Sequence, residues 1–234
     1  ICGVRAGHLV VALGAGEHDL GEVTSMPLTI CGSAVYNIAN IAAAALAAMA
    51  LGIDVTTLRV VLARFGSSAI DNPGRLMRYD VGGVRVVVDY AHNPEGLRGV
   101  LDVACHLRGD GRLVVLLGQA GDRDDASILA LAAVAAAARP DLVVIKETES
   151  YLRGRVPGEV PALLRAGLRA QGIDGASLME GSSEVAAARV ALSAARAGDT
   201  LLLPVHGHLA RGEVLTLIGR MRREGWRAGE ALPV

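Results

Sequence analysis

Residues 84–96 read VRVVVDYAHNPEG, an apolar run that leads into a polar turn and then into the start of a helix. The run does not alternate with polar residues, which is typical of a strand covered on both faces of a parallel sheet. Pro94 suits the first turn of a helix, where no backbone N–H is needed for the helical hydrogen bonds. We therefore expect a strand over 84–88 and a helix over 95–108.

The same order of apolar run and amphipathic segment continues to the C-terminal end, as in TLLLPV at 200–205 followed by a helical pattern. Alternation of this kind predicts βαβ units and a doubly wound α/β domain, Rossmann-like, with a mostly parallel sheet. The predicted strands are 84–88, 112–117, 142–145, 176–179 and 200–205. The predicted helices are 95–108, 125–139, 158–170, 183–197 and 212–224.

The first 72 residues follow a different pattern of short strands and alanine-rich helices. We expect strands over 8–13 and 28–31, and the 3.6-residue periodicity predicts helices over 36–50 and 56–64. Proline and glycine then interrupt both regular patterns at Asp71-Asn72-Pro73-Gly74. The sequence thus predicts one domain over 1–72 and a second over 73–234.

Composition excludes several classes of protein. The chain of 234 residues has 23 Lys+Arg against 24 Asp+Glu, a net charge of −1, and only 3% aromatic residues. Neither the charge nor the number of rings suits nucleic-acid binding. The longest apolar stretch is shorter than the ~20 residues that span a bilayer, so we expect no membrane segment. Three widely spaced cysteines without a CxxC pair favour reduced thiols and a cytoplasmic protein.

Loops that follow the predicted strands are where ligands bind in such sheets, because helix N-termini with unpaired N–H groups converge there. The first loop, 89–96, carries Asp89, His92 and Asn93. Asp89 could accept hydrogen bonds from ribose hydroxyls, or Asp89 or Asn93 could simply cap the following helix. The second loop, 118–125, reads GQAGDRDD and pairs glycines with a charged cluster; its alternative is a solvated turn with an aspartate cap.

Two further loops complete the set. The third, 146–155, reads KETESYLRGR, and a run of charges is also typical of a solvated loop. The fourth, 206–208, reads HGH, a weak metal pattern for which we favour polar loop residues over metal ligands. Lys146 is the only lysine, and no GxxxxGK[ST], GxGxxG or GxSxG motif occurs in the chain. A lysine phosphate loop, a dinucleotide fingerprint and a serine-hydrolase elbow are therefore missing.

Five motifs in sequence order are similar to those of one family. They are YNIANIAAA, NPGR, DYAHNP, GDRD and PVHGH. Together they resemble the end of the central domain and the C-terminal domain of the Mur ligase family, which makes amide bonds with ATP. PLTICGSAVYNIAN, AGDRDD and LRGRVPGEV are most similar to the cyanophycin synthetase branch of that family. The first domain is thus expected to be a partial Mur ligase central domain.

The resemblance implies ATP as the cofactor. It places Asn37 and Asn40 near adenine, Arg75 on the nucleotide and Asp89 on the ribose. The family's phosphate loop and its Mg²⁺-binding residues would lie upstream of residue 1, so ATP and Mg²⁺ would be held mainly by residues outside this chain. We therefore expect the lid fragment of a larger enzyme, with no catalytic residue of its own and no activity in isolation.

The resemblance also implies an amino-acid or peptide substrate, with arginine as the amino acid joined to a carboxylate. Our hypothesis is that Glu147 or Glu149 pairs with the guanidinium, while Arg153 or Arg155 faces a carboxylate. The expected substrate-binding residues are His92, Asn93, Asp122, Arg123, Glu147, Glu149, Arg153 and Arg155.

Two other interpretations stay open. The chain could belong to another Mur-type ligase, acting on a murein peptide or a folate, although the KETESYLRGR loop argues against both. It could instead be a non-catalytic nucleotide-binding or interaction module. The expected partners are ATP, the substrate and the missing N-terminal part of the same enzyme. A homo-oligomer is compatible with the sequence.

Overall fold

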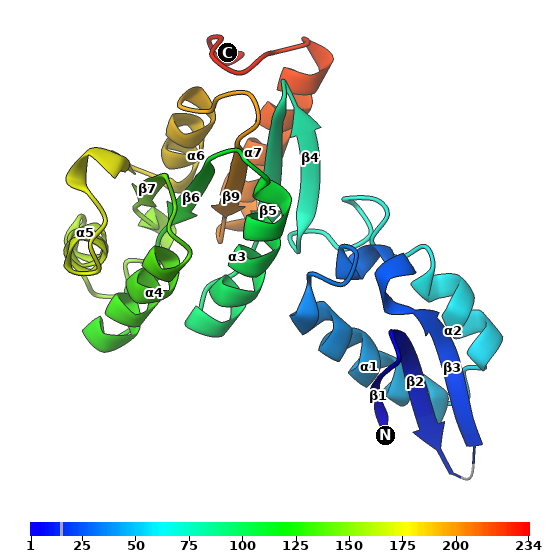
Figure 1. Cartoon of the computed structure of the whole chain (residues 1–234). Helices are drawn as coiled ribbons and strands as arrows, with labels where there is room; N and C mark the ends of the chain where they lie inside the picture. The colour runs from blue at the N-terminus through cyan, green and yellow to red at the C-terminus, as the bar shows by residue number, and fades with distance from the viewer. Residues whose placement is uncertain (15) are drawn as a thin grey trace. The chain divides into compact units, whose positions relative to one another are not determined.

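The computed structural model describes residues 1–14 and 16–234. These residues form two compact units, 1–73 and 74–234. The colour ramp of Figure 1 separates them, with the first unit in blue to cyan and the second in green to red.

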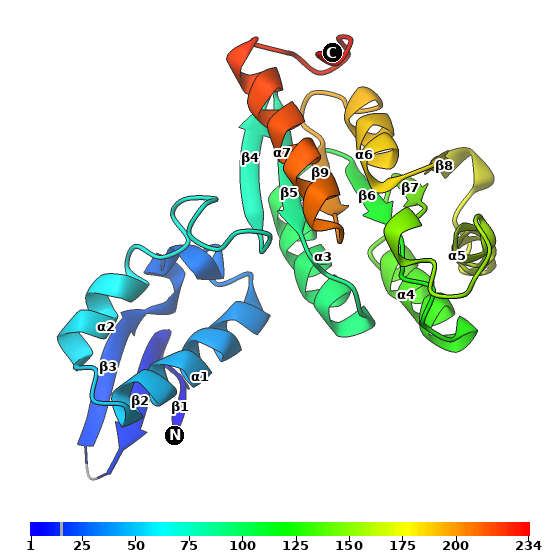
Figure 2. The same cartoon turned by 180° about the vertical axis from the view of Figure 1, so that it is seen from behind.

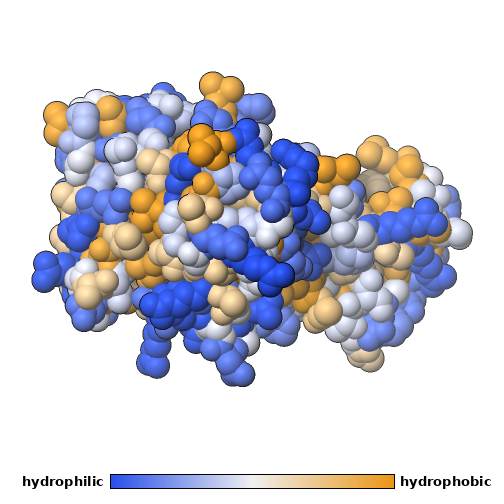
Figure 3. Space-filling model, turned by 90° about the horizontal axis from the view of Figure 1, so that it is seen from above, coloured by the Kyte–Doolittle hydropathy of each residue, from blue (hydrophilic) through white to orange (hydrophobic). Residues whose placement is uncertain are grey.

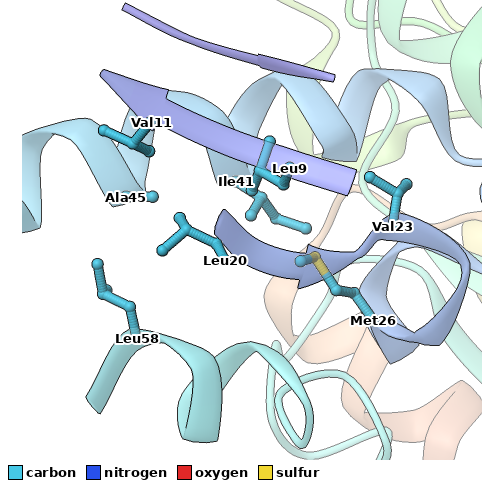
Figure 4. Packing of buried hydrophobic residues seen from close by; sticks show 8 residues of the cluster. All are labelled: Leu9, Val11, Leu20, Val23, Met26, Ile41, Ala45 and Leu58. Atoms are coloured by element: carbon cyan, nitrogen blue, oxygen red, sulfur yellow. The ribbon is translucent and has the colours of Figure 1, made fainter. Parts of the chain in front are cut away.

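The first unit packs two helices on a three-stranded antiparallel sheet of order β1-β2-β3. Its elements are β1 (Cys2–Arg5), β2 (His8–Leu13), β3 (Gly16–Glu22), the 3₁₀ turns η1 (Val23–Ser25) and η2 (Pro27–Thr29), α1 (Val35–Ala50) and α2 (Val55–Leu62). Leucine, valine and isoleucine side chains from the strands and both helices meet in one core, drawn in Figure 4. The members of this core are Leu9, Val11, Leu20, Val23, Met26, Ile41, Ala45 and Leu58.

One predicted strand of this unit is wrong. Residues 28–31 form a 3₁₀ turn followed by left-handed backbone, with φ of 51° at Ile30 and 53° at Cys31. Pro27 opens the turn, and the Thr29 hydroxyl donates to the carbonyl oxygens of Val23 and Met26. A side chain that hydrogen-bonds its own neighbourhood competes with strand pairing, so the local turn is favoured.

The second unit is a six-stranded sheet between two layers of helices. Its strands are β4 (Met77–Val81), β5 (Val84–Asp89), β6 (Leu113–Leu117), β7 (Leu142–Lys146), β8 (Leu178–Gly181) and β9 (Thr200–Pro204). Its helices are α3 (Pro94–Arg108), α4 (Asp125–Ala137), α5 (Glu159–Ala170), α6 (Glu184–Ser193) and α7 (His208–Arg223). The strand order is β4-β5-β9-β6-β7-β8, and every pairing is parallel except that of β4 with β5. The predicted α/β fold with a mostly parallel sheet is confirmed.

Figures 1 and 2 show how the layers are divided. The helices α3, α4 and α5 cover one face of the sheet, while α6 and α7 cover the other. Strands β6, β7 and β9 are buried along their whole length, which explains their unbroken apolar sequences. Because β9 returns between β5 and β6, the loops that follow β5, β6, β7 and β9 gather at one edge.

Strand β4 was not predicted, although the sequence contains a signal for it. Gly82 and Gly83 join β4 to β5, with φ of 59° and 84°. Two successive residues with positive φ are typical of the tight turn of a hairpin, and glycine adopts them without strain. The Gly-Gly pair before an apolar strand therefore indicated a hairpin.

The surface is mixed in character. On the face drawn in Figure 3, hydrophobic residues are scattered among hydrophilic ones. Within residues 1–14 and 16–234, no helix combines the length and the hydropathy that crossing a bilayer requires.

Candidate functional site

A pocket of about 210 Å³ lies at the carboxyl edge of the parallel sheet, where the loops after β5, β6, β7 and β9 meet. All four predicted loops contribute to its wall. The lining residues are Tyr90, His92, Gln119, Ala120, Asp122, Arg123, Thr148, Tyr151, Arg153 and His206. Four of the eight predicted substrate-binding residues, His92, Asp122, Arg123 and Arg153, are among them.

In the first loop, Asp89 is buried and its carboxylate is held by backbone. The amide of Leu76 donates to Oδ2 and the amide of Ala91 donates to Oδ1, both at 2.7 Å. Burial raises the pKa of the Asp89 carboxyl above its usual range, against the opposing effect of these hydrogen bonds. Asp89 thus fixes the start of the second unit to the pocket loop. The predicted ribose contact stays a prediction.

Asn93 adopts the capping role that the sequence left open. Its Oδ1 accepts the amide of Gly96 at 2.7 Å, and Asn93 is the N-cap of α3 with Pro94 at the first helical position. A cap of this kind satisfies an otherwise unpaired amide of the first turn. The side chain of Asn93 does not line the pocket.

Tyr90 stands at the centre of a cluster of rings and cations. The Arg75 guanidinium lies 4.8 Å and that of Arg211 5.8 Å from the centroid of the Tyr90 ring. The imidazoles of His92 and His206 lie 5.0 and 5.7 Å from it, centroid to centroid. The predicted nucleotide residue Arg75 is therefore tied to the pocket wall through Tyr90, which our sequence analysis did not select.

The second loop is held against the third. A Cβ on Gly121 would overlap the carbonyl oxygen of Leu152, so only glycine permits this approach. Arg155 donates to the carbonyl oxygens of Gly121 at 3.1 Å and Arg123 at 2.7 Å, and it pairs with Asp125 at 2.7 Å. Arg155 therefore joins the two loops and is not on the pocket wall, whereas Asp122 and Arg123 are.

In the third loop, both glutamates selected from the sequence are engaged in holding backbone. Glu147 is buried, its Oε1 accepts the amide of Thr148 at 3.2 Å and its Oε2 accepts the amide of Gly158 at 2.6 Å. Oε2 of Glu149 accepts the amide of Glu184 at 3.3 Å. Neither lines the pocket, whose wall takes Thr148, Tyr151 and Arg153 from this loop.

Behind the pocket lies an ion pair between Lys146 and Glu184, whose side chains are 0% and 2% exposed. Lys146 Nζ also donates to the carbonyl oxygen of Pro204 at 2.7 Å. Glu184 accepts the amides of His206 at 2.8 Å and Gly207 at 2.6 Å. Burial alone would raise the pKa of the Glu184 carboxyl, but the Lys146 charge and these hydrogen bonds hold it below its ordinary value.

This cluster connects β7, α6 and the loop after β9. The sequence contained a signal for it, since Lys146 is the only lysine in a chain of 23 Lys+Arg and it follows an apolar strand directly. Its partner Glu184 gave no signal, because nothing in the local pattern marks that glutamate as buried.

His206 differs from the expectation of a polar loop residue, because it is buried. Its Nε2 lies 2.9 Å from the carbonyl oxygen of Ala91, which can only accept, so Nε2 carries the proton. Burial, with the nearby Lys146 charge, lowers the pKa of His206 from 6.5 to about 3. The ring is therefore neutral and leaves Nδ1 as its acceptor.

The other predicted nucleotide residues lie in the first unit. Asn37 is buried and its amide donates to the carbonyl oxygen of Leu28 at 3.0 Å, while the Asn40 amide donates to Asn37 Oδ1 at 3.4 Å. Asn37 therefore supports the start of α1, and Asn40 is exposed. An adenine site shared by these residues with Arg75 and Asp89 stays a prediction.

Within the described part of the chain, no three His, Cys, Asp or Glu side chains are grouped as metal ligands would be. Carboxylates that could serve are committed elsewhere, as Glu147 and Glu184 are to backbone amides.

The fold and the pocket define a doubly wound α/β domain with a polar site at its carboxyl edge. Residues 74–204 match the profile described as Mur ligase, glutamate ligase domain. The chain belongs to the Mur ligase family, as the resemblance of its motifs indicated.

Curated relatives agree with this family. A cyanophycin synthetase of Synechocystis sp. is 36% identical over 164 residues, which is 70% of this chain and 18% of that protein. One from Crocosphaera subtropica is 35% identical over 69% of this chain and 18% of its own length. The UDP-N-acetylmuramoyl-L-alanyl-D-glutamate–2,6-diaminopimelate ligase of Corynebacterium efficiens is 34% identical over 81% of this chain and 35% of its own. The chain thus spans about a fifth to a third of these relatives.

Solved structures show the same fold. Escherichia coli FolC in complex with ADP aligns with a TM-score of 0.64 at 22% identity, over 96% of this chain and 47% of that one. A murein peptide ligase from Psychrobacter arcticus aligns with a TM-score of 0.59 at 18% identity, over 100% of this chain and 45% of that one.

Proposed function

We propose that this chain is the C-terminal part of an ATP-dependent ligase that joins an amino acid to a carboxylate through an amide bond, most similar to cyanophycin synthetase. The pocket at the carboxyl edge takes the amino acid. The observation that carries the proposal is the convergence of four loops, each separated in sequence, on one polar pocket of about 210 Å³ in a chain of this family.

The chemistry of the wall suits an amino acid. Arg123 and Arg153 are exposed cations on the wall, and a guanidinium binds a carboxylate through two parallel hydrogen bonds. Asp122 is the exposed carboxylate of the same wall. Since Glu147 and Glu149 accept backbone amides, Asp122 replaces them in our proposal as the partner of an arginine guanidinium.

ATP is the second substrate. Its phosphates and Mg²⁺ are held by residues outside this chain, and Arg75, Asp89, Asn37 and Asn40 contribute to the nucleotide site. Asp89 supports the nucleotide site by positioning Arg75. The Asp89 carboxylate accepts the backbone amide of Leu76, the residue that follows Arg75. An acyl-phosphate forms in such reactions and must be shielded from water, which is the role we assign to this lid.

Cytoplasmic localisation belongs to the same proposal. All three cysteines are described, and each is a free thiol. Free thiols fit a reducing compartment.

The test uses the full-length protein that contains this chain. With Mg-ATP, an oligo-aspartate acceptor and L-arginine, we expect ADP release that depends on arginine, and a product heavier by arginine residues in mass spectrometry. D122N lowers the rate at limiting arginine, whereas D174N, which changes an exposed helix-capping aspartate away from the pocket, leaves it unchanged. If ADP release does not depend on arginine, the assignment of arginine as the substrate is wrong.

Two alternatives predict other results. ADP release with meso-diaminopimelate and a murein peptide acceptor would instead favour the second group of relatives, to which the Corynebacterium enzyme belongs. Absence of ADP release with any amino acid, together with retained nucleotide binding, would favour a non-catalytic nucleotide-binding module.

A further inference from the structure

A buried hydroxyl on the pocket wall has no hydrogen-bond partner among the described residues. Thr148 is 2% exposed, lines the pocket, and its Oγ1 forms no hydrogen bond with any described residue. An unpaired buried hydroxyl is costly, so such a group is usually satisfied by a ligand or an ordered water, or is held in strain. The backbone of Thr148 is fixed, because its N–H donates to Glu147 Oε1 and its carbonyl accepts the amide of Tyr151 at 2.8 Å.

His206 provides a second acceptor on the same wall. Its Nε2 proton is donated to the Ala91 carbonyl oxygen, so Nδ1 offers a lone pair and no proton. The ring is also fixed, since the backbone amide of His206 donates to Glu184, the partner of Lys146. Thr148 and His206 are therefore preset in position, and little ordering is needed when a ligand binds.

Of the two groups, the neutral His206 ring discriminates between ligand atoms, and the Thr148 hydroxyl can accept a hydrogen bond beside it. A carboxylate placed against Nδ1 would face a lone pair, whereas an N–H group could donate to Nδ1 and to the Thr148 oxygen. The cations of the wall, Arg123 and Arg153, are suited to the anionic end of the ligand. The pocket wall therefore carries both acceptors and cations.

We propose that Thr148 Oγ1 and His206 Nδ1 are specificity-determining groups that accept hydrogen bonds from an N–H group of the amino acid bound in this pocket. This rests on the proposed function, because it presumes that the pocket takes an amino acid. It assigns selection for nitrogen to Thr148 and His206 rather than to the loop glutamates.

The chain offers a matched control. Thr200 is 0% exposed and its Oγ1 likewise forms no hydrogen bond with a described residue, but it begins β9, at the opposite end of the strand from the pocket. Threonine to valine removes a hydroxyl at nearly constant shape. T148V and T200V thus make the same chemical change inside and outside the proposed site.

The experiment titrates the 234-residue chain with L-arginine and with L-norleucine, following amide shifts by NMR. We expect T148V to weaken L-arginine binding by about tenfold, the loss of about one hydrogen bond. T148S should stay within about threefold of the wild-type chain, and T200V should match it. A penalty with both ligands assigns the N–H to the α-ammonium group, and a penalty with L-arginine alone assigns it to the guanidinium.

Two results would overturn the proposal in different ways. If the wild-type chain binds L-arginine and T148V binds it equally well, or if T148V and T200V weaken it alike, the role of Thr148 is wrong and the pocket stands. If neither amino acid shifts any amide of the pocket wall in the wild-type chain, the amino-acid pocket itself is wrong, and the role of Thr148 fails with it.

Discussion

Two groups of polar and charged residues lie near the strand-end loops and differ in their exposure to water. The buried cluster of Lys146, Glu184 and His206 is removed from water. The Lys146 and Glu184 charges pair with each other and with backbone groups, beside the neutral His206 ring. The rim, formed by Asp122, Arg123 and Arg153, is exposed on the pocket wall. Buried charges must be paired to be tolerated, whereas exposed ones contribute little to stability and are available to a ligand. The buried cluster thus fixes the loops that form the pocket, whereas the rim leaves its charges available to the ligand that we propose.

The largest effect is expected from breaking the buried ion pair. K146M leaves the Glu184 charge buried without its cation, and we expect the free energy of unfolding to fall by about 3–5 kcal/mol. Chemical denaturation of the 234-residue chain measures this. The control R165M removes the cation of an exposed pair with Glu180 and should cost below about 1 kcal/mol. Equal losses in the two variants would contradict the contrast between buried and exposed charges.

A smaller, pH-dependent effect is expected from His206. In the unfolded chain its imidazole takes up a proton near pH 6.5, but in the folded chain the pKa is about 3, so between these values the unfolded state binds more protons. The free energy of unfolding should therefore fall as the pH drops below 6.5, by about 1.4 kcal/mol for each pH unit.

Denaturation curves between pH 7 and pH 5 check this slope against two variants. H206Q should lose this part of the slope, while H208Q, at an exposed position two residues on, should keep it. An identical slope in the wild-type chain and H206Q would show that His206 is not held neutral by burial.

The smallest effect on stability is expected at the rim. R123A and R153A should each change the free energy of unfolding by no more than about 0.5 kcal/mol, since no buried partner loses its charge. Both should nevertheless weaken L-arginine binding in the NMR titration, with R169A, an exposed arginine at the end of α5, as the control. A rim variant that destabilised the chain as K146M does would remove the distinction between the two regions.

The alternation of apolar runs with amphipathic segments predicted most elements of the second unit. Apolar runs predicted four of its five parallel strands closely, whereas β8, which reads LMEG, was predicted two residues too early. Pro94 after Asn93 marked the start of α3. The helix that begins at His208 was expected only from 212, because Gly207 and the HGH segment carry no capping side chain. Strand 28–31 was wrong because the Thr29 hydroxyl bonds are a local competitor that apolar content does not reveal.

The residues that line the pocket could be predicted only in part, for a related reason, and their roles in binding stay predictions. His92, Asp122, Arg123 and Arg153 could be found because strand-end loops converge in any sheet of this kind. Glu147, Glu149 and Arg155 were charges in the right loop, but the structure engages them in backbone and interloop bonds. Sequence shows which charges a loop carries and not which of them already have partners.

The sequence by itself determined the α/β class, the order of the strands along the chain, the four loops and the family, since periodicity and short motifs are local properties. Only the tertiary structure decided that Lys146 meets Glu184, that burial lowers the pKa of His206, and that the Thr148 hydroxyl has no partner among the described residues. The physical reason is that burial and pairing depend on neighbours far away in sequence. The pairing of β5 with β9 brings His206 to Ala91, and the pairing of β7 with β8 brings Lys146 to the start of α6 at Glu184.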